Sequence, residues 1–174
     1  MATTQDAVAA EQHLLFILLD SNLPTGGFIS SSGLESYAKH GLLKAPIAPQ
    51  LVDFARAEVA NYARASLGFV RDGWNAVQAG HGVLDKIKEI DKTQEAMMLN
   101  HVARRSSKAQ GVAMLTLFSK GFSKPVYMAS GAEKTLAETL MDDYKKCIRR
   151  GEAEGHLNVC WGVITAALGI SLGT

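Results

Sequence analysis

The side chains best suited to metal binding or nucleophilic chemistry are histidine and cysteine, and their spacing in this chain supports neither. The histidines are His13, His40, His81, His101 and His156. No two of them lie three or four residues apart, the interval that places two ligands on one face of a helix. The two cysteines, Cys147 and Cys160, form no CxxC pair and have no histidine at zinc-finger spacing. Ordinary core or surface histidines are the simpler interpretation, and a metal site assembled across helices stays open as an alternative.

Motifs that carry catalysis are also missing from the sequence. It contains no GxxxxGK[ST], HExxH or GxSxG motif and no Rossmann glycine pattern. Glu35, Lys39 and His40 could form an acid–base cluster, although helix capping and a solvated face explain them more simply. We therefore predict no catalytic residue, no bound metal and no cofactor held by this chain. A protein that works through interfaces is favoured, and a small helical enzyme with a site assembled across helices is the alternative.

Composition and charge limit the kinds of partner that are expected. The chain has 174 residues, of which 47% are hydrophobic and 20% charged, a balance typical of one globular domain with a buried core. Its formal net charge is +1, which gives no reason to expect nucleic acid or an anionic membrane as a partner. The first twelve residues contain no basic side chain, unlike a secretory signal. We expect a cytoplasmic protein.

The elements that must position any site are predicted to be helices, because apolar residues recur at helical spacing and no segment alternates as a strand does. The fold class expected is all-α, one domain over residues 1–174 with seven to nine helices. Residues 8–20 are apolar on most sides in their second half, which predicts a central helix. Separate helices are expected for 51–62 and for 69–79.

The second half of the chain carries three further expectations. Residues 93–118 read as one long helix or as two joined near Ser106 and Ser107, and Gly111 within it suggests close approach of a neighbouring backbone. In the helix expected over 133–150, Asp142 and Lys146 have the spacing of an i, i+4 ion pair. The uncharged run 157–172 is shorter than a membrane span requires, so we expect a helix buried in protein.

The stretch LLFILLDSNLPTGGFISSSGLESYAKHG resembles the hallmark of the urease accessory protein F family. In that family an apolar helix is followed by a D-S-x-L-P-x-G-x-F turn and then by S-x-G-L-E at the head of a short helix. The matching residues here are Asp20, Ser21, Leu23, Pro24, Gly26 or Gly27, Phe28, Ser31, Gly33, Leu34 and Glu35. Their spacing is kept without a gap, and the residue pattern is similar to that of eukaryotic, fungal-type members.

Two later stretches support the same resemblance. RSSKAQG, from Arg105 to Gly111, is similar to an arginine-to-glycine helix segment of the family. HLNVCWGVITAALG, which starts at His156 and includes Gly162, is similar to its histidine, valine and glycine helix. The resemblance runs in order over nearly the whole chain.

The resemblance implies an all-helical, non-enzymatic chaperone of urease maturation. Such a protein bridges the D/H-type accessory protein and the nickel-carrying GTPase, accessory protein G, and the complex delivers nickel to apo-urease. A homodimer is also implied. We expect partner contacts at Phe28, Tyr37, Arg105 and Lys108, with a solvated helix face as the alternative for the basic residues. The glycines Gly26, Gly27 and Gly33 are expected to serve the turn.

Two departures from the family pattern qualify this expectation. Many bacterial members have a histidine where this chain has Ser30, so no metal role transfers to that position. The family continues past the helix that ends near Gly169, with an R-L-x-P-L-G-Q-type segment, and we expect this chain to lack that part. Truncation, alternative splicing and a faulty gene model would each explain it, and a truncated product without function is a further alternative.

Overall fold

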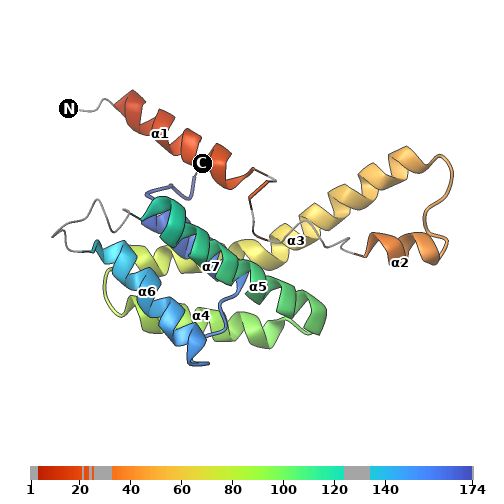
Figure 1. The fold of residues 1–174 in the computed structure, drawn as a ribbon. Coiled ribbons are helices and arrows are strands. Elements are labelled where there is room, and N and C mark those ends of the chain that lie inside the picture. The colour runs from red at the N-terminus through yellow and green to blue at the C-terminus, as the bar shows by residue number, and fades with distance from the viewer. Residues whose placement is uncertain (1–3, 21, 24, 26–32, 124–133, 174) are drawn as a thin grey trace.

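The chain folds as a bundle of α-helices, shown in Figure 1. The structure is a computed structural model, and it describes residues 4–20, 22–23, 25, 33–123 and 134–173. Within those ranges there are seven α-helices and one π-helical turn, and there is no strand. The elements are α1 (Thr4–Leu18), α2 (Leu34–Lys39), α3 (Ile47–Gln78), α4 (Val83–Met97), α5 (His101–Leu117), η2 (Phe118–Phe122), α6 (Leu136–Arg149) and α7 (Leu157–Ala167). The prediction of an all-α fold is confirmed.

The central helix is α7, and it is buried against α3 and α5. Eight of its eleven residues are buried. A helix that is apolar on every side is stable only when other helices surround it, which is the situation of α7 here. The prediction of a helix buried in protein is confirmed for residues 157–167, but the helix ends at Ala167, and Ser171 and Leu172 of the predicted run are exposed. No helix in the described part of the chain has the length and apolar character needed to cross a membrane.

Helix α1 lies on the periphery, which contradicts the prediction of a central helix over residues 8–20. Leu18 is buried, whereas Phe16 is 77% exposed and Leu19 is 70% exposed. Only one face of α1 packs against the bundle, with Leu14, Leu15 and Leu18 turned toward the core. Apolar residues on several sides of a helix therefore did not show that other helices surround it. The segment after α7 is tied to α1, since the backbone N–H of Ser171 donates to Glu11 Oε1 at 2.6 Å.

Helix α3 is one continuous helix of 32 residues, in place of the two helices expected over 51–62 and 69–79. Its second half crosses α7 at very short range. A Cβ atom added to Gly162 of α7 would lie 2.0 Å from the carbonyl oxygen of Val70. Figure 1 shows that α2 and the first half of α3 extend beyond the body formed by α4, α5, α6 and α7.

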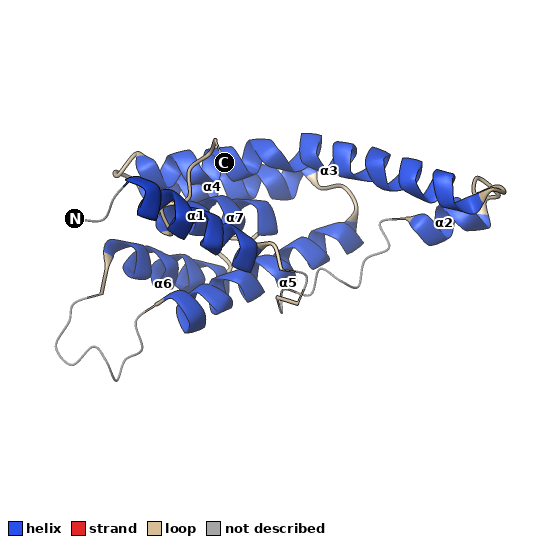
Figure 2. Ribbon diagram, turned by 90° about the horizontal axis from the view of Figure 1, so that it is seen from above, coloured by secondary structure: helices blue, strands red, loops and turns tan. Residues whose placement is uncertain are grey.

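Residues 93–118 form neither one long helix nor two helices joined near Ser106 and Ser107, because a turn at residues 98–100 separates α4 from α5. Asn100 ends the turn and caps α5, because its side-chain oxygen accepts from the backbone N–H groups of Val102 and Ala103. Seen from above, α4 lies next to α3, and α5 lies next to α6 on the opposite side of the body (Figure 2). Ser107 is buried and serves the interior of the bundle.

Helix α6 begins with a capping box formed by Thr135 and Glu138. Its charged residues pair differently from the expected i, i+4 contact. Lys146 lies 2.8 Å from Asp143, and Asp142 pairs instead with Lys134, which precedes the helix. These ion pairs are on the surface and contribute little to stability.

Candidate functional site

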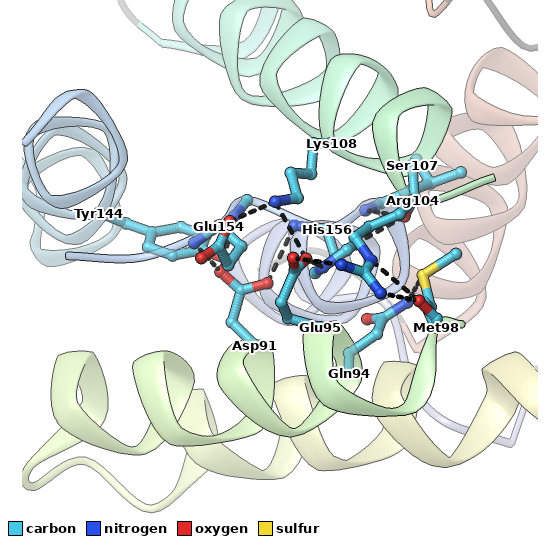
Figure 3. Close-up of polar contacts among 12 residues, drawn as sticks. Asp91, Gln94, Glu95, Met98, Arg104, Ser107, Lys108, Tyr144, Glu154 and His156 are labelled. Atoms are coloured by element: carbon cyan, nitrogen blue, oxygen red, sulfur yellow. Dashed lines mark hydrogen bonds and ion pairs between the residues drawn. The ribbon is translucent and has the colours of Figure 1, made fainter. Parts of the chain in front are cut away.

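The densest group of polar side chains in the described structure lies where α4 and α5 meet the N-terminus of α7 (Figure 3). The close-up shows acidic side chains of α4 pointing toward α5, basic side chains of α5 pointing back, and the turn before α7 between them. We call this group the polar cluster. Its members are Asp91, Glu95, Arg104, Ser107, Lys108, Tyr144, Glu154 and His156.

Asp91, on α4, binds the turn that leads into α7. Its Oδ2 atom accepts from the backbone N–H groups of Glu154 at 2.8 Å and Gly155 at 2.6 Å, and from the hydroxyl of Tyr144 at 3.0 Å. Its Oδ1 atom accepts from the N–H of His156 at 2.9 Å. The side chain is fully buried. Four donors therefore compensate its loss of hydration, and the positive end of the α7 dipole adds to that effect.

The local backbone makes this binding possible. Gly155 has a φ of +76°, in the left-handed region that glycine adopts without strain. Successive N–H groups in such a turn converge on one point and form a concave anion site. Here the anion is a carboxylate of the same chain, so the site is already filled by Asp91.

His156 occupies the N-cap position of α7 and is fully buried. Its Nε2 atom lies 2.8 Å from Glu95 Oε2, and its Nδ1 atom lies 3.1 Å from Ser107 Oγ. Ser107 Oγ also accepts from the N–H of Leu157 at 3.1 Å. With its proton on Nε2, the ring donates to Glu95 and accepts from the Ser107 hydroxyl, so every polar atom of this chain of hydrogen bonds is satisfied.

Glu95 connects this buried chain to the surface cations of α5. Its Oε2 atom lies 3.0 Å from Lys108 Nζ, and its Oε1 atom lies 3.3 Å from Arg104. Burial opposes ionisation of Glu95, but the hydrogen bonds from Lys108 and His156 outweigh it and lower the pKa of the carboxyl. Lys108 also binds Glu154, and although burial alone lowers its pKa, the two carboxylates raise it.

Gly111 explains how α5 comes so close to the turn before α7. A Cβ atom at this position would lie 2.0 Å from the carbonyl oxygen of Gly155 and 2.9 Å from the carbonyl carbon of His156. The close backbone approach that the sequence suggested at Gly111 is confirmed. It also brings the second and third motif stretches, which begin at Arg105 and His156, into direct contact.

The arrangement of the polar cluster is that of a structural lock. Each charged member is bound by partners from the same chain. A surface depression of about 550 Å³ lies beside it, lined by Lys88, Glu89, Lys92, Gly151, Glu152, Ala153 and Glu154. Glu95, Lys108 and Cys160, whose pKa values are displaced, do not line it. The described ranges contain no group of three or more His, Cys, Asp or Glu residues arranged to hold a metal ion.

The residues expected to contact partners occupy different environments. Arg105 is exposed on α5, whereas the amino group of Lys108 is engaged by Glu95 and Glu154. Tyr37 of α2 packs its ring against Phe54 of α3, with 5.1 Å between the ring centroids. Phe28 lies outside the described residues.

The first motif stretch is only partly described. Asp20 accepts from the backbone N–H of Asn22 at 2.8 Å, so it stabilises the start of the turn. Gly33 has a φ of +91° and is the N-cap of α2, which also contains Leu34 and Glu35. Leu23 is half-buried. The motif residues Ser21, Pro24, Gly26, Gly27 and Ser31 lie outside the described part of the chain.

Sequence reasoning missed Asp91 and Glu95, which organise the polar cluster. One signal was present in the sequence. Asp91 and Glu95 are four residues apart on one helix, and Arg104 and Lys108 are four residues apart on the next, so each pair falls on one helix face. Complementary charges at the same interval on consecutive helices are consistent with two faces that meet.

Comparisons with known proteins agree on one family. The UreF family model matches residues 48–174, which is more than half of the chain. The chain is 50% identical to urease accessory protein 6 of Cryptococcus neoformans, over 93% of this chain and 64% of that protein. It is 30% identical to a UreF-like protein of Schizosaccharomyces pombe, over 93% of this chain and 63% of that protein.

A bacterial relative extends the same pattern. The chain is 28% identical to urease accessory protein UreF of Paenarthrobacter aurescens, over 94% of this chain and 63% of that protein. It thus spans a little under two thirds of the length of these relatives. No solved structure matched the chain. Because the family model covers α3 to α7, including every member of the polar cluster, this chain belongs to the UreF family.

Proposed function

We propose that this chain is a non-catalytic accessory protein of urease maturation. The family match over residues 48–174 carries the proposal, and the relatives from Cryptococcus and Paenarthrobacter are named urease accessory proteins. The polar cluster supports a structural role for its residues, because its charged groups bind one another and hold α4, α5 and α7 together. The function then depends on the outer surfaces of the bundle.

In this proposal the chain is a scaffold that bridges the D/H-type accessory protein and the nickel-carrying GTPase in the cytoplasm. Nickel is the cargo of the assembly, which passes it to apo-urease. A scaffold can couple nickel release to GTP hydrolysis only if it contacts the states of the GTPase differently. Arg105, Tyr37, Phe28 and Lys108 are the proposed contact residues, and Arg105 is the strongest of them because it is exposed on a rigid helix.

The test is restoration of urease in a host that lacks its own UreF protein. The chain is expressed with urease and the remaining accessory proteins, and the nickel content and activity of the purified urease are measured. We expect both to rise above those of a host carrying the empty vector. Equal nickel content in the two hosts, with the chain shown to be folded, would contradict the proposal.

A pull-down separates the two bridging contacts. The tagged chain is incubated with the D/H-type protein alone, with the GTPase alone and with both together. We expect the tagged chain to retain each of the two proteins. The proposed homodimer is tested separately, by sedimentation of the chain alone.

A further inference from the structure

The outer face of α5 is an exposed, largely apolar stripe. Val102, Arg105, Ala109 and Val112 follow one another at intervals of three or four residues, so they lie on one side of the helix. All four are exposed. Leu99, in the turn just before α5, is 88% exposed, and Val102 is 63% exposed. We call this set the α5 stripe.

The charged residues of α5 are all basic. Helix α5 contains no Asp or Glu. Two of its cations, Arg104 and Lys108, are neutralised by Glu95 and Glu154. Arg105 has no ion pair among the residues that the structure describes, and it lies between Val102 and Ala109 on the stripe. A single positive charge thus sits within an apolar strip.

Contacts on the opposite side of α5 hold the helix that carries the stripe in place. Asn100 caps α5, and the Arg104 side chain donates to the backbone carbonyl of Met98 at 2.8 Å, which closes the turn. Gly111 seats the same helix against the backbone of Gly155. A binding surface that is ordered before the partner arrives loses little conformational entropy on binding.

We propose that the α5 stripe docks an amphipathic helix of a partner protein, which places a carboxylate on Arg105 and apolar side chains on Leu99, Val102 and Val112. From Leu99 to Val112 the stripe is about 20 Å long, enough for roughly four turns of a partner helix. Arginine flanked by apolar residues is typical of the side chains that dominate protein interfaces. This inference rests on the proposed scaffold function and names the surface and chemistry of one of its contacts.

The test uses paired substitutions in the full chain. Val102→Asp is matched with Leu136→Asp, because both residues are exposed in the first turn of a helix, where an added carboxylate suits the dipole. Arg105→Glu is matched with Arg64→Glu, which changes an exposed arginine within α3. Affinity is measured against three purified probes from one organism: the D/H-type protein, the GTPase and apo-urease.

We expect Val102→Asp and Arg105→Glu each to weaken the binding of the same probe by about tenfold or more, with the two controls within about twofold of the wild type. Circular dichroism and cooperative thermal unfolding verify that each variant is folded, and Arg105→Ala serves as a second, milder variant. If the wild-type chain binds a probe and the stripe variants bind it equally well, the docking inference is wrong and the scaffold function stands. If only Arg105→Glu has an effect, the partner is not an amphipathic helix and the inference also fails. If the wild-type chain binds none of the probes, the scaffold function falls and the inference falls with it.

Discussion

Asp91 Oδ2 lies 2.6 Å from the backbone nitrogen of Gly155, although 64 residues separate the two in the chain. The contact joins the middle of α4 to the turn that starts α7. Together, the two oxygens of the Asp91 carboxylate bind three consecutive N–H groups and so fix the direction in which the central helix leaves that turn. Tyr144 donates to the same oxygen and brings α6 to the same point.

Asp91→Asn should destabilise the fold strongly. The amide keeps one acceptor, and its NH₂ group would face N–H donors, leaving buried polar groups unpaired. We expect a loss on the order of 3 kcal/mol in the free energy of unfolding, measured by urea titration. The control is Asp85→Asn on the same helix, where the carboxylate is exposed and forms a surface ion pair with Lys88, so its effect should stay within about 0.5 kcal/mol. Equal losses in the two variants would show that Asp91 has no special role.

Gly111→Ala should also destabilise the protein, because the new methyl group would overlap the carbonyl oxygen of Gly155, which is backbone and cannot rotate away. The loss should reach roughly 1–3 kcal/mol, the usual cost of overpacking. Gly68→Ala in α3 is the matched control, since among the described residues nothing beyond the backbone of its own helix lies within 4 Å of its added Cβ. That variant should match the wild type or be more stable by up to about 1 kcal/mol, because alanine favours the helix. The unfolding temperatures of both variants are compared with that of the wild type. An unchanged unfolding temperature for Gly111→Ala would contradict the close approach of Gly111 to the backbone of Gly155.

The stabilising contribution of Glu95 should depend on pH in the acid range. The pKa of Glu95 is lowered in the folded protein, so its contribution is fully present above the unfolded value of about 4.3 and is lost as the pH falls through the folded value. Urea unfolding of wild type and Glu95→Gln at several pH values between 3 and 7 measures it. The free energies of unfolding of the wild type and of Glu95→Gln should differ clearly near pH 6 and should converge as the pH falls toward 3. Glu89→Gln, at an exposed position of α4, should show a small difference from wild type at every pH, and a constant gap for Glu95→Gln would be evidence against the ionic role.

The two thiols should be unreactive in the folded protein. Cys147 and Cys160 are both free and buried. Burial raises the pKa of each, most strongly for Cys160, so little thiolate forms near neutral pH. A water-soluble aromatic disulfide should label both only after denaturant is added. Leu136→Cys supplies a rapid-labelling reference at an exposed position, and native cysteines that react as quickly as that reference would disprove the burial.

Much of the helical content could be predicted from local pattern, but helix boundaries and neighbours could not. The apolar run of α7 predicted a buried helix, and Gly111 indicated a close backbone contact. The position of α1 was predicted wrongly, because its apolar residues do not specify how many helices surround it. The turn at 98–100 was missed because the residue type of Asn100 does not by itself distinguish a helix cap from a polar residue within a helix. In the structure its side chain accepts from the N–H groups of Val102 and Ala103, which identifies it as the cap of α5.

The sequence by itself determined the all-helical class, the family resemblance and the lack of a recognisable catalytic motif, since each depends on residue types at short, regular intervals. Only the tertiary structure decided that Asp91 and Glu95 bind the start of α7, that Lys108 is engaged within the chain, and that Arg105 remains on an exposed stripe. The physical reason is distance along the chain. Hydrogen bonds and ion pairs between residues about 50 to 65 positions apart depend on how helices pack, and helical periodicity does not encode which faces meet.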